Sequence, residues 1–251
     1  MAHLKKITDY LGRTLKLDEI ADWPTAMNGL QLANPGKVTK IAAAVDACGF
    51  TIEAAIKSGA DLLIVHHGLF WSGAQPLTGG NYWKFKAAFA NDLAIYSAHL
   101  PLDVHPALGN NALLCEALGI KKRTPFFFEK GQFIGYKSKV RLRRSELQER
   151  LAKVLGGPVH LCPGGPEIIR NLGVVTGGAG AEINKAASEG IDTFITGEGP
   201  HWSFTAAEEL GVNLFLGGHY ATETFGVKAL AAHLSRKFRL PWEFIDHPTG
   251  L

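Results

Sequence analysis

Paired cysteines, long apolar runs and a strong excess of one charge are all missing from this sequence of 251 residues. Its three cysteines, Cys48, Cys115 and Cys162, form no CxxC pair and have small or apolar neighbours, so we expect reduced, structural thiols and no thiolate zinc site. No segment approaches the roughly 18 to 20 apolar residues that span a bilayer. The first 15 residues alternate apolar and charged positions, unlike a signal peptide. These absences predict a cytoplasmic protein without a membrane partner.

The charge is nearly balanced, with a formal net charge of +3. Basic residues are spread along the chain except for a tract at residues 137–144, which we interpret as a solvated strand and helix start. This distribution does not indicate nucleic acid as a partner. With 46% hydrophobic and 20% charged residues, the composition is that of a globular protein.

One pattern occurs twice in the chain. Residues 41–71 align without a gap on residues 172–202, so that Asp61 falls on Asp192 and Trp71 on Trp202. We interpret this as an internal duplication. It predicts an α/β fold of two similar lobes, residues 1–124 and 125–251, with a C-terminal helix that can pack back on the first lobe.

Each copy reads as a βαβ unit with strands that are apolar at consecutive positions, as in a parallel sheet covered on both faces. The first segment predicts two short helices, the second capped by Asp18. A hairpin around Lys130-Gly131 and a helix that starts at a capping box, Ser145-x-x-Gln148, are expected between the copies. Strands are expected at residues 38–46, 61–65, 93–98, 212–216 and 241–245. Helices are expected at residues 51–58, 83–91 and 222–238.

Metal-ligand residues end both copies. His66 and His67 stand at the end of a buried strand, where α/β folds gather ligands. The next strand of each copy ends in the same spacing, His99 with Asp103 and His219 with Glu223. Individual histidines are usually structural, but this set together indicates a metal site.

Adjacent histidines on a regular strand point to opposite faces. His66 and His67 therefore require either a turn at His67 or two metals flanked by the pair, and we favour two metals. Asp103 and Glu223 can bridge two cations. A donor set of nitrogen and oxygen suits two divalent ions of zinc, iron or manganese. Such a pair activates water for hydrolysis of a polar substrate.

Two features keep alternatives open. His99 can bind a metal, hydrogen-bond a ligand from outside the coordination sphere or act as a proton shuttle. The segment TGGAG at residues 176–180 links a strand to a helix, but it has neither the Lys-Ser/Thr pair of a P-loop nor the full GxGxxG spacing. We favour a tight packing turn over a phosphate-binding loop.

The motifs NGLQ at 28–31, HHGLFW at 66–71, SAHLPLD at 97–103 and GGHYATETFG at 217–226 resemble those of the GTP cyclohydrolase I type 2 homologs, also called Ngg-interacting-factor-three-like proteins. The resemblance implies a two-lobed subunit with a dimetal site in the cleft between the lobes and a homohexameric ring built from dimers. It makes His66, His67, Asp103, His219 and Glu223 the metal ligands and places His99 at the rim of the site.

Two functions are compatible with these residues. The first is a metal-dependent hydrolase, GTP cyclohydrolase-like, that acts on a purine nucleotide or related heterocycle. The second is a non-enzymatic metal-binding protein with a structural, metal-handling or regulatory role. An open coordination position would favour the enzyme, whereas a site closed by protein ligands would favour the second function.

Overall fold

The computed structural model describes residues 1–251, and the chain divides into two compact units. Unit 1 comprises Met1–His105 and Gly226–His247, and unit 2 comprises Pro106–Phe225 and Pro248–Leu251. The expected lobe boundary after residue 124 falls inside unit 2, at the first strand of a hairpin. The long helix α9 (His219–Phe238) begins in unit 2 and belongs to unit 1 from Gly226 onward. None of the helices combines the length and apolar character needed to cross a bilayer.

A five-stranded sheet forms the centre of unit 1, in the order β13-β4-β5-β6-β2. Strands β13, β4, β5 and β6 are parallel and β2 is antiparallel to β6. The strands of unit 1 are β1 (Ala2–His3), β2 (Gly29–Leu32), β3 (Lys37–Val38), β4 (Ile41–Asp46), β5 (Leu62–His67), β6 (Ala94–Ser97) and β13 (Trp242–Phe244). The expected apolar strands and the edge strand near the C-terminus are therefore present.

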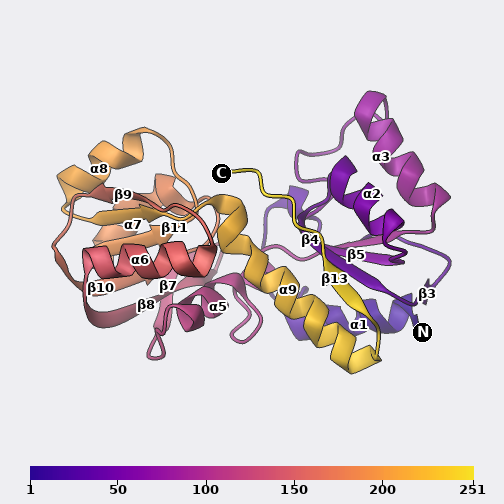
Figure 1. Ribbon diagram of the computed structural model, residues 1–251, viewed down its shortest axis with the longest axis horizontal. Coiled ribbons are helices and arrows are strands. Elements are labelled where there is room, and N and C mark those ends of the chain that lie inside the picture. Colours follow the sequence, from indigo (N-terminus) through magenta and orange to yellow (C-terminus); the bar gives the residue numbers. More distant parts are fainter. The chain divides into compact units, whose positions relative to one another are not determined.

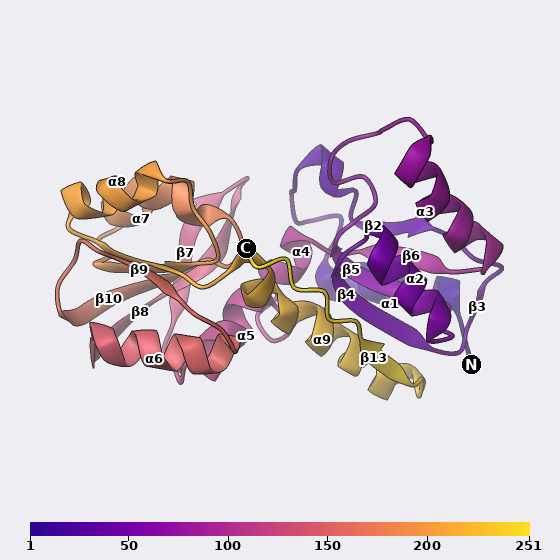
Figure 2. The same cartoon turned by 45° about the horizontal axis from the view of Figure 1, so that its top comes forward.

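Helices cover both faces of this sheet. On one face lie α2 (Gly49–Lys57) and α3 (Gly79–Ala90), and on the other lie α1 (Leu4–Leu15) and the second part of α9 (Figure 1, Figure 2). The alternate residues of β4 and β5 face opposite helix layers, so both strands are buried throughout their apolar length. The remaining helices of unit 1 are the single turns η1 (Pro24–Ala26) and α4 (Leu100–Asp103).

A six-stranded sheet forms the centre of unit 2, in the order β7-β8-β10-β11-β12-β9. Strands β10, β11 and β12 are parallel, and the other three run antiparallel to their neighbours. The strands are β7 (Thr124–Glu129), β8 (Gln132–Arg143), β9 (His160–Pro163), β10 (Ile168–Val174), β11 (Thr193–Thr196) and β12 (Asn213–Leu216). The helices are α5 (Asn110–Ala117), α6 (Arg144–Leu155), η2 (Ala179–Glu182), α7 (Ile183–Ser188) and α8 (Trp202–Leu210).

The layers of unit 2 follow the same principle. Helices α7 and α8 lie on one face of the sheet, and α5 and α6 lie on the other (Figure 2). Leu147 and Leu151 of α6 join Leu114 and Cys115 of α5 in a core cluster against the sheet. Burial raises the pKa of the Cys115 thiol to about 12, which agrees with the expected inert, structural cysteine.

The hairpin was predicted correctly, and the capping box at Ser145 was not. Helices α2, α3 and α9 begin two to four residues earlier than expected. Lys130 and Gly131 both have positive φ, as a two-residue hairpin turn requires. No capping box forms at Ser145, because α6 begins at Arg144, whose N–H donates to Glu167 O. Gln148 donates to Val159 O instead.

The second short helix expected after Asp18 is absent. Lys16 ends α1 in the left-handed region, and only the turn η1 follows. Pro24 opposes helical geometry at Trp23, and Asp22 accepts a hydrogen bond from Trp23 N. The segment is thereby held open as a loop, which brings Asp22 to the histidines described below.

The two units share one local arrangement. Each contains a parallel βαβαβ succession, β4 to β6 in unit 1 and β10 to β12 in unit 2. Asp61 Oδ2 accepts from the backbone N–H groups of Thr39 and Lys40, and Asp192 Oδ2 accepts from those of Arg170 and Asn171. Aligned aspartates therefore tie down the entry of the first parallel strand in both units.

We expect Asp61→Ala and Asp192→Ala to destabilise the protein by similar amounts. Each change removes an acceptor shared by two backbone donors, and the loss should be about 1–3 kcal/mol. Urea denaturation followed by circular dichroism measures it, with Asp9→Ala as control, because Asp9 makes only an exposed helical ion pair with Lys5. A loss at Asp192 no larger than at Asp9 would contradict the structural role of this carboxylate.

Candidate metal centre

In unit 1, the sequence-predicted ligands gather at the carboxyl ends of parallel strands. His66 and His67 are the last residues of β5, and His99 precedes the single turn α4, which ends at Asp103. The ligand nitrogens of His66, His67 and His99 lie within 4.8 Å of one another. Asp103 Oδ2 lies 3.4 Å from His66 Nε2. All four side chains are buried. Buried polar groups need partners, so a cluster of four is not explained by packing of the apolar core.

The orientation of the adjacent histidines is fixed by oxygen acceptors. His66 Nδ1 donates to Ala98 O at 2.9 Å, and His67 Nδ1 donates to Asp46 Oδ1 at 2.8 Å. A carbonyl or carboxylate oxygen can only accept, so the neutral imidazole carries its proton on Nδ1 and its lone pair on Nε2. This is the arrangement in which proteins present histidine to a metal.

His99 is held in the same way by a buried carboxylate. Its Nδ1 lies 3.0 Å from Asp22 Oδ1, and its backbone N–H donates to Asn28 Oδ1 at 2.7 Å. Burial raises the pKa of Asp22, but the hydrogen bond and charge of His99, with donors from Asn28 and Trp23, outweigh it and leave the pKa below its usual value. Asp22 is therefore ionised, and His99 directs Nε2 away from it.

Unit 2 presents a smaller set at the corresponding strand ends. Helix α9 begins at His219, so His219 and Glu223 lie one turn apart on the same helix face. His219 Nδ1 donates to Glu198 Oε1 at 2.9 Å, and His219 Nε2 lies 3.2 Å from Glu223 Oε2. Burial lowers the pKa of His219, but the hydrogen bonds and charges of Glu223 and Glu198 outweigh it and raise the pKa to about 9. In the metal-free protein a proton therefore lies between His219 and Glu223, at the position where a metal ion would bind both side chains.

The segment at residues 176–180 supports this carboxylate. Gly177 has φ of +73°, and a Cβ there would overlap Glu223 Oε1. The N–H groups of Gly177, Ala179 and Gly180 donate to Thr222, Thr196 and Glu198 respectively. Because these amides are engaged within the protein, the segment is the tight packing turn that we favoured over a phosphate loop.

The donor set fits divalent metal ions. Each of the four histidines has Nδ1 at an oxygen acceptor, and the carboxylates of Asp103 and Glu223 lie beside Nε2 of His66 and of His219. An imidazole lone pair and a carboxylate oxygen repel at such distances unless a cation or proton lies between them. Nitrogen and oxygen donors are those of zinc, iron and manganese sites.

Five residues that support the site were not identified as site residues from the sequence. Asp22, Asn28, Gln31, Asp46 and Glu198 hold the histidines or the turns around them. Gln31 Oε1 accepts from Leu69 N, and its side chain fills the space where a Cβ of Gly68 would stand. Two signals were present in the sequence, the NGLQ motif and the alignment of Glu198 with His67.

Comparison with known proteins identifies relatives along nearly the whole chain. The family model described as Duf34/NIF3 (NGG1p interacting factor 3) matches residues 2–249. The GTP cyclohydrolase 1 type 2 homolog of Deinococcus radiodurans is 40% identical over 248 residues, 98% of this chain and 94% of the relative. The protein of the same name from Halobacterium salinarum is 41% identical over 252 residues, with 98% of each chain covered.

Solved structures show the same fold. The crystal structure of TTHA1606 from Thermus thermophilus superposes with a TM-score of 0.92 at 36% identity and covers 99% of this chain and 100% of its own. Reduced HcgD from Methanocaldococcus jannaschii gives a TM-score of 0.86 at 27% identity, with 98% of each chain covered.

We expect Gly177→Ala to weaken metal binding strongly, because the new methyl group must displace Glu223 and the left-handed backbone disfavours alanine. Gly178→Ala is the matched control, since its Cβ would meet only ordinary contacts at 3.5 Å and beyond. Competition with a chromogenic chelator measures both affinities. Equal affinities would show that the close approach of Gly177 to Glu223 does not matter.

The raised pKa of His219 predicts a pH dependence of the metal-free protein. His219 takes up its proton more tightly in the folded state, so its contribution is complete below about pH 6.5 and is lost as the pH rises through about 9. The contribution is on the order of 3 kcal/mol. Urea unfolding in EDTA should show the difference between wild type and His219→Gln shrinking across this range. A difference independent of pH would refute the assignment.

Proposed function

The chain belongs to the Duf34/NIF3 family, and on that basis we propose that it is a dimetal-dependent hydrolase acting on a purine nucleotide or a related heterocycle. The observation that carries the proposal is the common orientation of four histidines, each held at Nδ1 by an oxygen atom so that Nε2 is directed away from that oxygen. One such histidine is ordinary in a protein core. Four of them beside two buried carboxylates support a site made for cations.

We propose that the chain holds a dimetal centre. Its ligands would be His66, His67 and Asp103 from unit 1 and His219 and Glu223 from unit 2, which together hold two divalent ions of zinc, iron or manganese. His66 and His67 are adjacent at the end of β5 and their ligand nitrogens lie within 4.8 Å of one another, so the pair can flank two ions held close together.

When bound, the two cations would supply Lewis acidity that activates water and polarises the substrate. His99 would act as the proton shuttle between the attacking water and the leaving group. Ionised Asp22 holds His99 Nδ1 and stabilises the imidazolium form, so Nε2 can accept a proton from the attacking water and return it to the leaving group. The ring of Trp71, centred 4.4 Å from that of His99, restricts the orientation of the imidazole.

The substrate class rests on the relatives' name, GTP cyclohydrolase 1 type 2 homolog, which makes GTP the first compound to test. Hydrolytic opening of a heterocycle needs an activated water and a proton donor for the departing nitrogen. The proposed centre offers both, through the cation site and His99.

We further infer that the two units descend from one duplicated segment. The ungapped alignment, the shared βαβαβ succession and the matching hydrogen bonds of Asp61 and Asp192 support this inference. The homohexameric ring and the cytoplasmic location remain predictions from the resemblance and from the composition.

We expect His67→Ala to lose most of the bound metal and with it the hydrolysis of GTP, by at least the roughly 100-fold that loss of even an outer-shell partner can cost. Elemental mass spectrometry and nucleotide chromatography on metal-replete protein measure the two quantities. The exposed His3→Ala is the matched control and should keep about two metals per chain.

Three outcomes decide the proposal. Parallel loss of metal and turnover in His67→Ala supports the hydrolase. Two metals without turnover by the wild type would overturn the activity on GTP and favour a structural or metal-handling role. Absence of metal after reconstitution with zinc, iron and manganese would overturn the metal centre itself.

A further inference from the structure

The basic tract at residues 137–144 is not used by the proposed centre. Most of it lies in β8, where Lys139, Arg141 and Arg143 are exposed and alternate with the partly buried Val140 and Leu142. Alternation with period two places the cations on one face of the strand and the apolar residues on the other. The tract is therefore a solvated strand, as expected, but its cations share a single face.

A cavity of about 740 Å³ opens beside this part of β8. Its volume is that of a site for a small organic ligand. Polar and basic residues dominate its wall, and three neighbours from the segment before β7 join those of β8. The lining includes Lys121, Lys122, Arg123, Lys137, Ser138 and Lys139.

The charge of this cavity is strongly unbalanced. Five cations line it against the single carboxylate of Glu189, whose Oε2 lies 3.2 Å from Lys137 Nζ and whose Oε1 accepts from Phe127 N. Lys122 and Lys139 have no carboxylate partner among the ion pairs of the structure. Like charges brought together around a concavity repel, and a bound anion relieves that repulsion.

The backbone that carries these cations is held by neutral contacts. Ser138 Oγ donates to Lys122 O, which ties the segment before β7 onto β8. Arg123 lies over the Tyr136 ring at 5.0 Å. Lys139 pairs with Asn171 of β10, whose side chain shares that face and adds a hydrogen-bonding group to the cavity. The positive surface is thus built on paired strands.

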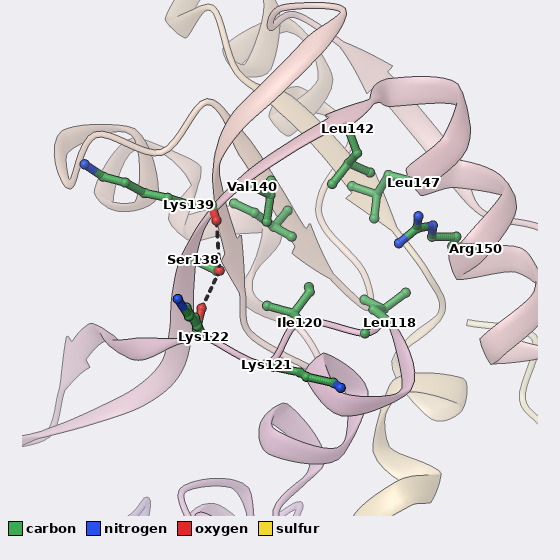
Figure 3. A pocket seen from close by; sticks show the side chains of 12 residues that line it. Leu118, Ile120, Lys121, Lys122, Ser138, Lys139, Val140, Leu142, Leu147 and Arg150 are labelled. Carbon is green, nitrogen blue, oxygen red and sulfur yellow. Dashed lines mark hydrogen bonds between the residues drawn. The ribbon is translucent and has the colours of Figure 1, made fainter.

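A second, apolar hollow of about 270 Å³ adjoins the basic cavity and shares Lys121, Lys122, Ser138 and Lys139 with it. Figure 3 shows leucine, isoleucine and valine side chains gathered on one side of Ser138, while Lys122 and Lys139 point to the other side. Arg150 of α6 stands at the far rim of the apolar hollow. The two hollows therefore lie on opposite faces of β8, and the face with Lys137 and Asn171 carries the basic cavity.

We propose that this surface of unit 2 binds a small phosphorylated molecule carrying several negative charges, with its phosphates among Lys122, Lys137 and Lys139. The cations surround a concavity of limited volume, and its lining contains no aromatic side chain on which successive bases could stack. These features favour a compact polyphosphate over a nucleic-acid strand. Asn171 lies in the middle of β10 and Ile191 precedes β11, whereas the metal-ligand residues of unit 2 follow the carboxyl end of β12.

Isothermal titration calorimetry with inorganic triphosphate tests the proposal. The titration is run in EDTA so that metal ions cannot bridge the probe to the protein. We expect saturable binding at one site per chain, weakened at least about tenfold in Lys122→Ala/Lys139→Ala. The control Lys6→Ala/Lys153→Ala removes the same charge from exposed positions elsewhere and should change the affinity by no more than about twofold.

A substitution that is expected to strengthen triphosphate binding completes the test. Glu189→Gln removes the one carboxylate of the lining and should tighten triphosphate binding, since it leaves Lys137 without its ion pair. Three results would overturn the proposal: no binding by the wild type, equal loss in both double variants, or tighter binding of a single-stranded oligonucleotide that depends on the same two lysines. The last result would show that this surface binds a nucleic-acid strand and not a small phosphorylated molecule.

Discussion

The hydrogen bond to Nδ1 of each site histidine is the interaction on which the candidate centre depends. Ala98 O, Asp46, Asp22 and Glu198 each fix one imidazole in the tautomer that presents Nε2. Without these acceptors the rings could rotate or carry the proton on the other nitrogen, and the same residues would coordinate poorly. The residues that supply the acceptors are therefore part of the site, although of the acceptor residues only Glu198 had a signal in the sequence.

The parallel sheets explain why the ligands gather where they do. In each unit, successive strands run in the same direction, so residues that follow their carboxyl ends meet at one edge. His66 and His67 end β5, and His219 follows β12 closely. In unit 2 the basic cavity instead lies along β8 and beside the residues that precede β11.

Glycine positions show how tightly the backbone is fitted to these side chains. Gly177 allows Glu223 to approach the turn after β10, and Gly68 leaves room for Gln31 beside the turn after β5. In both places a methyl group would occupy the position of a polar side chain atom. The turns are therefore specified by packing against the site as much as by their own conformational preference.

The sequence by itself determined the α/β class, the parallel strands and the hairpin at Lys130-Gly131, because these follow from local periodicity, spacing and alignment. The same spacing and alignment predicted which histidines and carboxylates are candidate metal ligands. It did not determine the helix starts near Asp18 and Ser145, where Pro24 and the contact of Arg144 with Glu167 decide the local geometry. Only the tertiary structure decided the partners of the histidines. Asp22 lies 77 residues from His99 along the chain, and such a pairing depends on loop closure that no local pattern encodes. The basic cavity likewise needed the fold, since Lys122 and Lys139 meet only after β8 pairs with its neighbours.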